Sequence, residues 1–252
     1  MQDMYYHNCE VSVLYYCCGI SDKGAVCDSN EDAVLINKRV FTDDHEECEL
    51  EAPFIAAVAD GVGGENAGEV ASHMALEQLS ALKYGKKTDL SAKLMNIHTK
   101  LRRYAAVHSG HANMQTTLCA LAVDEDERAF AVNVGDSRGY LITHQISQIT
   151  KDHSMVMNLY ERGDITKEQL KNHPKKNIIT RAVGVAQDVE PDYFESELPK
   201  GAAVLLCSDG LSNFCDEGVI FRTVKDLPPE EVPHALVKVA LDNGGSDNIT
   251  AV

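Results

Sequence analysis

Short runs of apolar residues, bounded by polar turns, recur along most of the chain. Runs of about four to eight apolar residues are typical of buried β-strands. They predict strands at 11–18, 33–36, 54–59, 117–123, 129–134, 139–143 and 202–207, and a further strand within "NITAV" (248–252). Because "DEDE" and "GDSR" turns join the three runs between 117 and 143, we expect those strands to form an antiparallel meander.

Apolar residues with helical spacing predict helices at 66–83, 89–107 and about 229–242, each with one core-facing side. The segment 151–181 is polar and predicts two short helices, with breaks at Gly163-Asp164 and at Pro174. Strands, then paired helices, then strands again are typical of an α+β sandwich rather than of alternating βαβ units. We expect residues 1–252 to form a single domain.

Charge and cysteine content exclude several classes of function for this protein. The 252 residues include 39 Asp and Glu against 23 Lys and Arg, a net charge of -16. Such a surface repels nucleic acid and anionic lipid, so neither is an expected partner. The start of the sequence lacks the pattern of a signal peptide, and no apolar run is long enough to span a bilayer. Eight cysteines without metal-binding spacing indicate reduced, mostly buried thiols in a cytoplasmic protein.

Four aspartates stand at strand ends. Asp60, Asp136 and Asp209 follow apolar runs, and Asp247 comes just before one. Each alone is more typical of a turn, because Asp beside Gly or Ser is common there. Strand ends of one sandwich share an edge, however, and two charges 4 Å apart repel by roughly 1 kcal/mol even in water. The set therefore predicts a site for hard cations such as Mg²⁺ or Mn²⁺, with Gly61 allowing close approach of its carbonyl.

A series of motifs surrounds these aspartates. In chain order they are "NEDAV" (30–34), "ADGVGGENAGEVAS" (59–72), "MQTTL" (114–118), "VGDSRGYL" (134–141), "ITKDHS" (149–154), "ITRAVG" (179–184), "LLCSDGLSN" (205–213) and "GGSDNIT" (244–250). The series resembles metal-dependent Ser/Thr protein phosphatases of type 2C (PPM), the bacterial members in particular, and it extends over nearly the whole chain.

The resemblance implies a four-layer α-β-β-α sandwich of two antiparallel sheets flanked by helix pairs. It also implies a metal centre with two Mn²⁺ or Mg²⁺ ions. Asp60 would bridge the two ions, Gly61 would offer its carbonyl to one, and Asp209 and Asp247 would complete the other. Asp136, together with Asp209, would form a weaker third site.

Further roles follow from the same resemblance. Glu31 and Asp32 would hold waters bound to the metals, and the stretch 152–181 would be a flap that influences substrate choice. The chain departs from the family pattern at two positions. Cys27 stands where relatives carry an arginine that holds the substrate phosphate, so the phosphate-binding group is unknown. Asn213 replaces an acid that often supports the third metal.

The implied function is hydrolysis of phosphoserine and phosphothreonine in proteins through a water activated by a dinuclear Mn/Mg centre. In such a centre the cations, not a protein nucleophile, provide most of the charge stabilisation. The expected partners are phosphoproteins and a cognate Ser/Thr kinase, and the expected state is a monomer without membrane insertion. The alternative is a pseudophosphatase that binds a phosphoprotein without efficient turnover. The losses at 27 and 213 favour it, and the intact Asp60, Asp209 and Asp247 oppose it.

Overall fold

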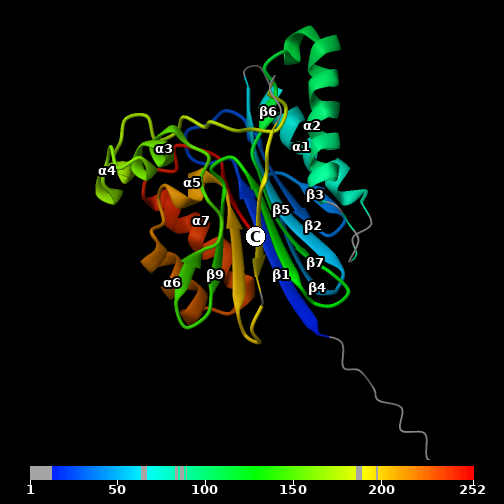
Figure 1. Ribbon diagram of the computed structural model, residues 1–252. Coiled ribbons are helices and arrows are strands. Elements are labelled where there is room, and N and C mark those ends of the chain that lie inside the picture. Colours follow the sequence, from blue (N-terminus) through cyan, green and yellow to red (C-terminus); the bar gives the residue numbers. More distant parts are fainter. Residues whose placement is uncertain are drawn as a thin grey trace, which may run out of the picture.

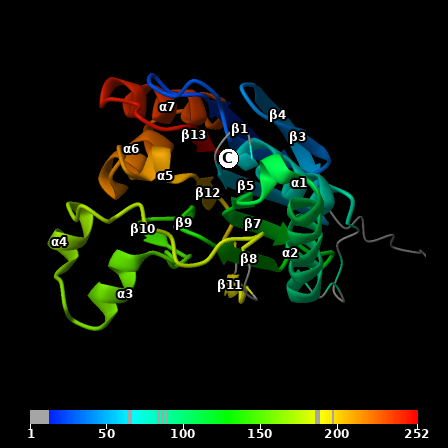
Figure 2. The same ribbon diagram turned by 90° about the horizontal axis from the view of Figure 1, so that it is seen from above.

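The strands of the protein form two antiparallel sheets that pack face to face, with helices on both outer faces (Figures 1 and 2). The computed structural model describes residues 13–63, 67–82, 85, 88, 90–185, 189–196 and 198–252. Apolar side chains fill three levels within these residues: one between the sheets and one under each helical layer. The expected α+β class and the four-layer sandwich are confirmed.

One sheet carries helices α5 (Asp209–Ser212), α6 (Glu217–Asp226) and α7 (Val232–Asp242) on its outer face. A 3₁₀ turn at Pro229–Glu231 leads into α7. The strand order is β10 (Ile146–Gln148), β9 (Arg138–Ile142), β12 (Ala203–Cys207), β13 (Ile249–Ala251), β1 (Leu14–Asp22) and β4 (His45–Glu51).

The other sheet is covered by α1 (Ala67–Ser80) and α2 (Leu90–Val107), and a 3₁₀ turn at Ser109–His111 follows α2. Its strand order is β11 (Asp192–Ser196), β8 (Ala129–Val134), β7 (Leu118–Val123), β5 (Phe54–Val62), β2 (Asp32–Ile36) and β3 (Arg39–Phe41). The short strand β6 (Gln115–Thr116) pairs with the end of β5.

Strand β5 shows why the central strands are apolar without interruption. Ile55, Ala57 and Ala59 pack under the helices, whereas Phe54, Ala56 and Val58 face the other sheet. Successive residues of a strand point to opposite faces. Because both faces of this sheet are covered, both sets must be apolar, and the alternation typical of a half-exposed strand is missing.

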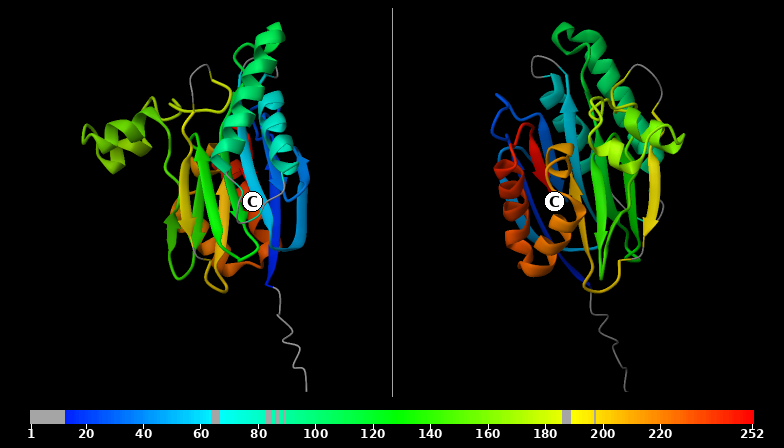
Figure 3. Two further views of the ribbon diagram at one scale, coloured as in Figure 1. Left: turned by 45° about the vertical axis from the view of Figure 1, so that its right-hand side comes forward. Right: turned by 90° about the vertical axis from the view of Figure 1, so that its left-hand side faces the viewer.

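Helices α3 (Met155–Glu161) and α4 (Lys167–Lys171) lie in the segment between β10 and β11 and project from the body of the sandwich (Figure 3). Each begins at a side-chain cap: Ser154 accepts from the amide of Met157, and Thr166 forms a capping box with Gln169. A bridge between Ser154 and Ile179 closes the base of the segment. We call residues 155–178 the flap.

The predicted meander is wrong in its last strand. Strands β7 and β8 pair as expected, but β9 leaves them and lies between β10 and β12 in the other sheet. The turn that changes sheets contains Gly135, whose φ of 111° favours glycine. The next residue in this crossing turn is Asp136, so the crossing carries an acidic side chain to the edge of both sheets.

Several elements were not predicted. Strands β3, β4, β6, β10 and β11 are short, polar or half-exposed, and α6 was left without assignment. Strand β1 extends to Asp22, beyond its predicted end. Residues 11, 12, 66, 83 and 89, which belonged to predicted elements, lie outside the described residues. The cysteines are less buried than expected: Cys119, Cys207 and Cys215 are buried, whereas Cys17, Cys18, Cys27 and Cys48 are half-buried.

Truncation of Leu206 tests the packing between the sheets. Its side chain is 1% exposed and lies in the cluster between them. Leu206→Ala should lower the free energy of unfolding by about 2–5 kcal/mol, through lost burial and the cavity left behind. The matched control Val107→Ala, at a side chain 76% exposed, should change it by less than about 0.5 kcal/mol. Urea unfolding in EDTA measures both, and equal midpoints for the two variants would contradict this packing.

Candidate metal-dependent active site

The predicted acidic residues lie at the edge where strands of both sheets end. Asp60 and Asp32 are directly opposite each other in the antiparallel pair of β5 and β2. Asp209 begins α5 two residues after β12, and Asp247 precedes β13, which pairs with β12. Asp136 comes from the turn between β8 and β9. The structure therefore gathers acids that are far apart in the sequence.

Mutual repulsion is visible in the pKa values of these acids. Burial raises the pKa of Asp60 well above its usual range, and the charges of Asp32, Asp209, Asp136 and Asp247 raise it further. Burial, followed by the charge of Asp209, raises the pKa of Asp136 to about 8. The carboxylates are thus close enough to oppose one another's ionisation, and the set lacks sufficient counter-charge.

Asp32 is the most enclosed of these acids, with 1% of its surface exposed. Burial raises its pKa to about 8, and hydrogen bonds from Thr250 and Ser208 oppose that rise. Within the described residues its Oδ2 has no hydrogen-bond partner. A buried acceptor without a partner is costly and indicates a missing donor, water or ion.

Gly61 and Glu31 are held together by close backbone packing. The amide of Gly61 donates to the carbonyl of Glu31 over 3.1 Å, and Ser72 Oγ donates to the same carbonyl over 2.6 Å. A Cβ on Gly61 would collide with the carbonyl oxygens of Gly68 and Glu31. Glycine is therefore required here, and it brings the end of β5 against the start of α1. Burial and the charge of Glu69 raise the pKa of Glu31.

Two threonines fix the backbone of Asp60, a role that sequence reasoning missed. Asp60 N donates to Thr117 Oγ1 over 2.9 Å, and Thr116 Oγ1 donates to Asp60 O over 3.0 Å. Both threonines are buried. The available signal was a pair of hydroxyl residues in "MQTTL" at the start of an otherwise apolar strand.

Asn248 is a second missed residue, and it joins the two ends of the described chain. Its Nδ2 donates to the carbonyls of Lys23 and Ser29, over 2.9 and 3.0 Å, and its Oδ1 accepts from the amide of Glu31 over 2.8 Å. This one side chain therefore positions the loop that leads to Glu31 and Asp32, next to its own neighbour Asp247.

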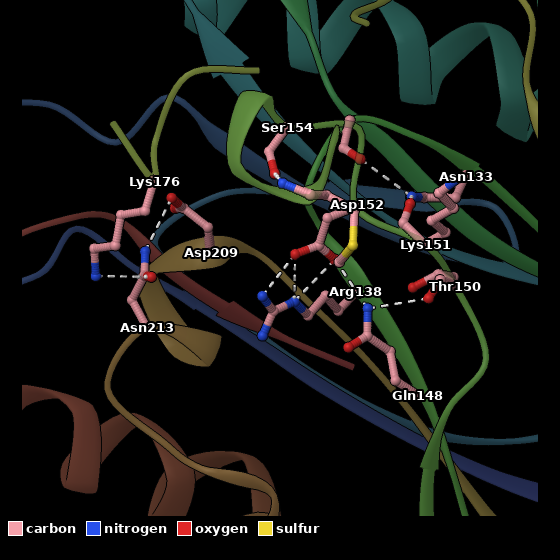
Figure 4. A network of polar contacts seen from close by, with 12 residues as sticks. Asn133, Arg138, Gln148, Thr150, Lys151, Asp152, Ser154, Lys176, Asp209 and Asn213 are labelled. Carbon is pink, nitrogen blue, oxygen red and sulfur yellow. Dashed lines mark hydrogen bonds and ion pairs between the residues drawn. The ribbon is translucent and has the colours of Figure 1, made fainter. Parts of the chain in front are cut away.

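The turn that carries Asp136 is held by a polar network (Figure 4). Arg138 Nη2 donates to Asp152 Oδ2 over 2.6 Å, and Arg138 Nε lies 3.0 Å from each Asp152 oxygen. Gln148 Nε2 also donates to Asp152, over 2.9 Å. The salt bridge with Asp152 therefore commits the charge of Arg138 to the turn.

His153 holds the same turn from its other side. Its amide donates to the carbonyl of Gly135 over 2.8 Å, and its Nδ1 accepts from the amide of Gly135 over 3.1 Å. Its Nε2 lies 3.1 Å from Asp192 Oδ2 and 3.1 Å from Arg181 Nη1. Burial lowers the pKa of His153, which favours the neutral ring.

Asn213 and Cys27, the two positions that the resemblance marks as departures, contact different residues near the acids. Asn213, at the end of α5, donates from Nδ2 to Asp209 Oδ2 over 3.1 Å and accepts from Lys176 Nζ over 3.1 Å (Figure 4). Cys27 is half-buried in the loop before Glu31, and its thiol donates to the carbonyl of Ser246 over 3.7 Å. Lys176 comes from the flap.

Comparison with known proteins decides the family. The sequence model described as protein phosphatase 2C matches residues 35–238. The serine/threonine phosphatase Stp of Listeria monocytogenes is 37% identical over 245 residues, which cover 92% of each chain. The chain belongs to the protein phosphatase 2C family. The assignment to type 2C protein-serine/threonine phosphatases, made from the motifs, is therefore confirmed.

Solved structures of the family have the same fold. The serine/threonine phosphatase PstP/Ppp of Mycobacterium tuberculosis superposes with a TM-score of 0.80 at 34% identity, covering 94% of this chain and 96% of that one. The catalytic domain of PstP in complex with two manganese ions gives a TM-score of 0.77 at 33% identity, with the same shares of each chain. In the part of the chain described here, no helix is long and apolar enough to cross a membrane.

The acidic edge fits a divalent cation by its chemistry. Among the described residues, no three Asp, Glu, His or Cys side chains already stand together as a closed metal site. Carboxylates without counter-charge repel one another, so an open arrangement is expected. The donors are oxygens only, and Gly61 brings its backbone close to Glu31. One buried oxygen of Asp32 lacks a partner among the residues that the structure describes. Such a donor set suits Mg²⁺ or Mn²⁺.

The raised pKa values predict how metal-free protein responds to pH. Unfolded aspartates release their protons near pH 4, whereas folded Asp209 and Asp136 hold theirs to about pH 6 and about pH 8. Between these limits the folded state binds more protons, so the free energy of unfolding falls as pH rises. In EDTA, the melting temperature should therefore drop from pH 5 to pH 8.

Asp136→Asn should reduce that drop, because it removes one repelling charge. Relative to wild type, its melting temperature in EDTA should be higher at pH 8, by about 2–4 °C for each kcal/mol of repulsion removed. The exposed Asp226→Asn, at the end of α6, is the control and should follow wild type. A melting temperature that rises with pH in this window would contradict the described electrostatics.

Proposed function

We propose that the protein hydrolyses phosphoserine and phosphothreonine in proteins at a centre of two Mn²⁺ or Mg²⁺ ions bound to the acidic edge. The observation that carries the proposal is the gathering of Asp60, Asp136, Asp209 and Asp247 with buried Asp32 at one edge. The raised pKa values of Asp60, Asp136 and Asp32 indicate missing positive charge there. The family membership and a manganese-bound relative support it.

Each residue has a part in this proposal. Asp60 would bind both ions, the carbonyl of Gly61 would bind one of them, and Asp209 and Asp247 would bind the other. Two cations of this kind lower the pKa of a bound water towards 7 and neutralise charge on the phosphate oxygens. The buried Thr116 and Thr117 fix the backbone of Asp60, so that its carboxylate keeps one orientation.

The remaining acids support this centre. Glu31 and Asp32 would hold waters bound to the ions, and Asp136 with Asp209 would hold a weaker third ion. Asn213 donates to Asp209 and so leaves one fewer carboxylate for that third ion. The three aspartates that turnover needs are present, which argues against a pseudophosphatase.

The proposed substrates are phosphoproteins, including the targets of a cognate Ser/Thr kinase. We propose that the protein acts as a monomer. The flap borders the acidic edge, because Lys176 reaches Asn213, so the flap is the segment that a bound phosphoprotein meets beside the centre.

Metal dependence tests this function. Turnover of a phosphothreonine peptide should require Mn²⁺ or Mg²⁺ and disappear in EDTA. Asp60→Asn and Asp209→Asn should each lower kcat by at least about a thousandfold, because each removes a charged ligand of the ions. Steady-state kinetics with phosphate release gives the measurement.

The exposed variant Asp242→Asn, whose carboxylate pairs with Lys238 away from the site, should keep wild-type kinetics. Mn²⁺ should raise the melting temperature of the wild type by mass action. Full activity in EDTA, or unimpaired turnover by Asp60→Asn, would refute the proposed centre.

A further inference from the structure

The flap places a positive charge beside the acidic edge. Lys176 Nζ donates to Asn213 Oδ1 over 3.1 Å, and Asn213 Nδ2 donates to Asp209 Oδ2 over 3.1 Å (Figure 4). The ammonium is therefore linked to an acid of the proposed centre through a single amide. Lys176 is half-buried, whereas its neighbour Lys175 is exposed.

The ammonium of Lys176 has donors to spare. An ammonium carries three N–H donors, and within the described residues Lys176 Nζ makes one hydrogen bond, to Asn213. Arg138, another cation near Asp209, is instead neutralised by a salt bridge in which its Nη2 lies 2.6 Å from Asp152 Oδ2, and its Nη1 donates to Tyr140. Lys176 is thus the better placed of the two to receive a negatively charged ligand.

The side-chain amide of Asn213 leaves the charge of Lys176 available for a ligand. An aspartate at this position would form a direct ion pair with Lys176 and would neutralise its charge. Asparagine instead holds the ammonium by one neutral hydrogen bond and leaves its charge uncompensated.

Residue 27 provides no positive charge for the substrate phosphate. Burial, followed by the charge of Asp247, raises the pKa of the Cys27 thiol, so the side chain stays neutral and donates to Ser246 O. A phosphate monoester carries one to two negative charges and is bound best by charged donors. The substrate must obtain that contact from another part of the chain.

We propose that Lys176 binds the phosphate of the substrate and so takes the place of the arginine that Cys27 replaces. The inference rests on the proposed function, because it assumes that a phosphoprotein enters this edge. Asn213 keeps one N–H of the ammonium, and the remaining N–H groups donate to phosphate oxygens. The phosphate-binding charge then comes from the flap rather than from the loop before β2.

Substitution of Lys176 in the full chain gives the first test. Inorganic phosphate is titrated into Mg²⁺-loaded protein, and binding is followed by phosphorus NMR, which does not depend on turnover. Lys176→Met should weaken phosphate binding by about 10- to 100-fold, the worth of a hydrogen bond to a charged group. Lys175→Met, the adjacent and exposed lysine, should bind phosphate as the wild type does.

A second measurement separates loss of the charge from damage to the flap. Mg²⁺ affinity of Lys176→Met should equal or exceed that of the wild type, because a positive charge near Asp209 has been removed. Lys176→Arg should retain phosphate binding. Parallel loss of Mg²⁺ and phosphate binding in Lys176→Met, or equal phosphate affinity in the Lys176→Met and Lys175→Met variants, would overturn the proposal.

Cys27→Arg provides a rescue. In the Lys176→Met background it should recover most of the lost phosphate affinity and of the increase in KM for a phosphothreonine peptide. In the wild type it should add less, because the phosphate already has a cation, and this non-additivity is the sign of a shared role. Equal gains in both backgrounds would show that the two positions act independently, contrary to the proposal.

The proposed function is tested separately by the turnover of wild type with and without EDTA. Phosphate titration reports on Lys176 whichever result that assay gives. A wild type that binds phosphate through Lys176 but does not turn over would overturn the proposed function alone. If the wild type shows metal-dependent turnover but Lys176→Met leaves its phosphate affinity unchanged, only the present inference is overturned.

Discussion

Repulsion between buried carboxylates is the constraint on which this structure depends. Five aspartates converge at one edge of the sandwich, and burial and neighbouring charge both oppose the ionisation of four of them, Asp32, Asp60, Asp136 and Asp209. The fold holds them there through rigid surroundings: threonine hydroxyls on Asp60, an asparagine on the loop before Asp32, and a clamped turn at Asp136. The concentrated negative charge lowers the stability of this edge, as is common at functional sites.

Strands covered on both faces could be predicted from the sequence, and strands at the margins could not. Strands β5 and β7 are continuous apolar runs because the helices cover one face and the other sheet covers the opposite face. Strand β4, "HEECELE", lies at a sheet edge and alternates exposed with half-buried residues, so no apolar run marks it. The crossing of β9 depends on pairing with β12, about 65 residues later, which local pattern cannot reveal.

In the candidate site, too, some residues could be predicted from the sequence and others could not. Its acids could be predicted because each stands at the end of an apolar run or just before one, and the motif order supplied their family roles. The residues that hold them were missed: Thr117, Asn248 and His153 are ordinary polar residues in the sequence, and their roles arise from partners 18 to 225 positions away. The position of Lys176 likewise depends on how the flap folds back towards α5.

The contacts of Asn248 also limit the order in which parts of the protein can fold during synthesis. Its hydrogen-bond partners lie 217 to 225 residues earlier in the sequence, and the neighbouring strand β13 is central in its sheet, between β12 and β1. A nascent chain can form the α1–α2 layer and its sheet early, but the sheet that contains β1 and β12 stays divided until β13 has left the ribosome. Chains that lack β13 therefore have neither a continuous sheet nor an assembled acidic edge.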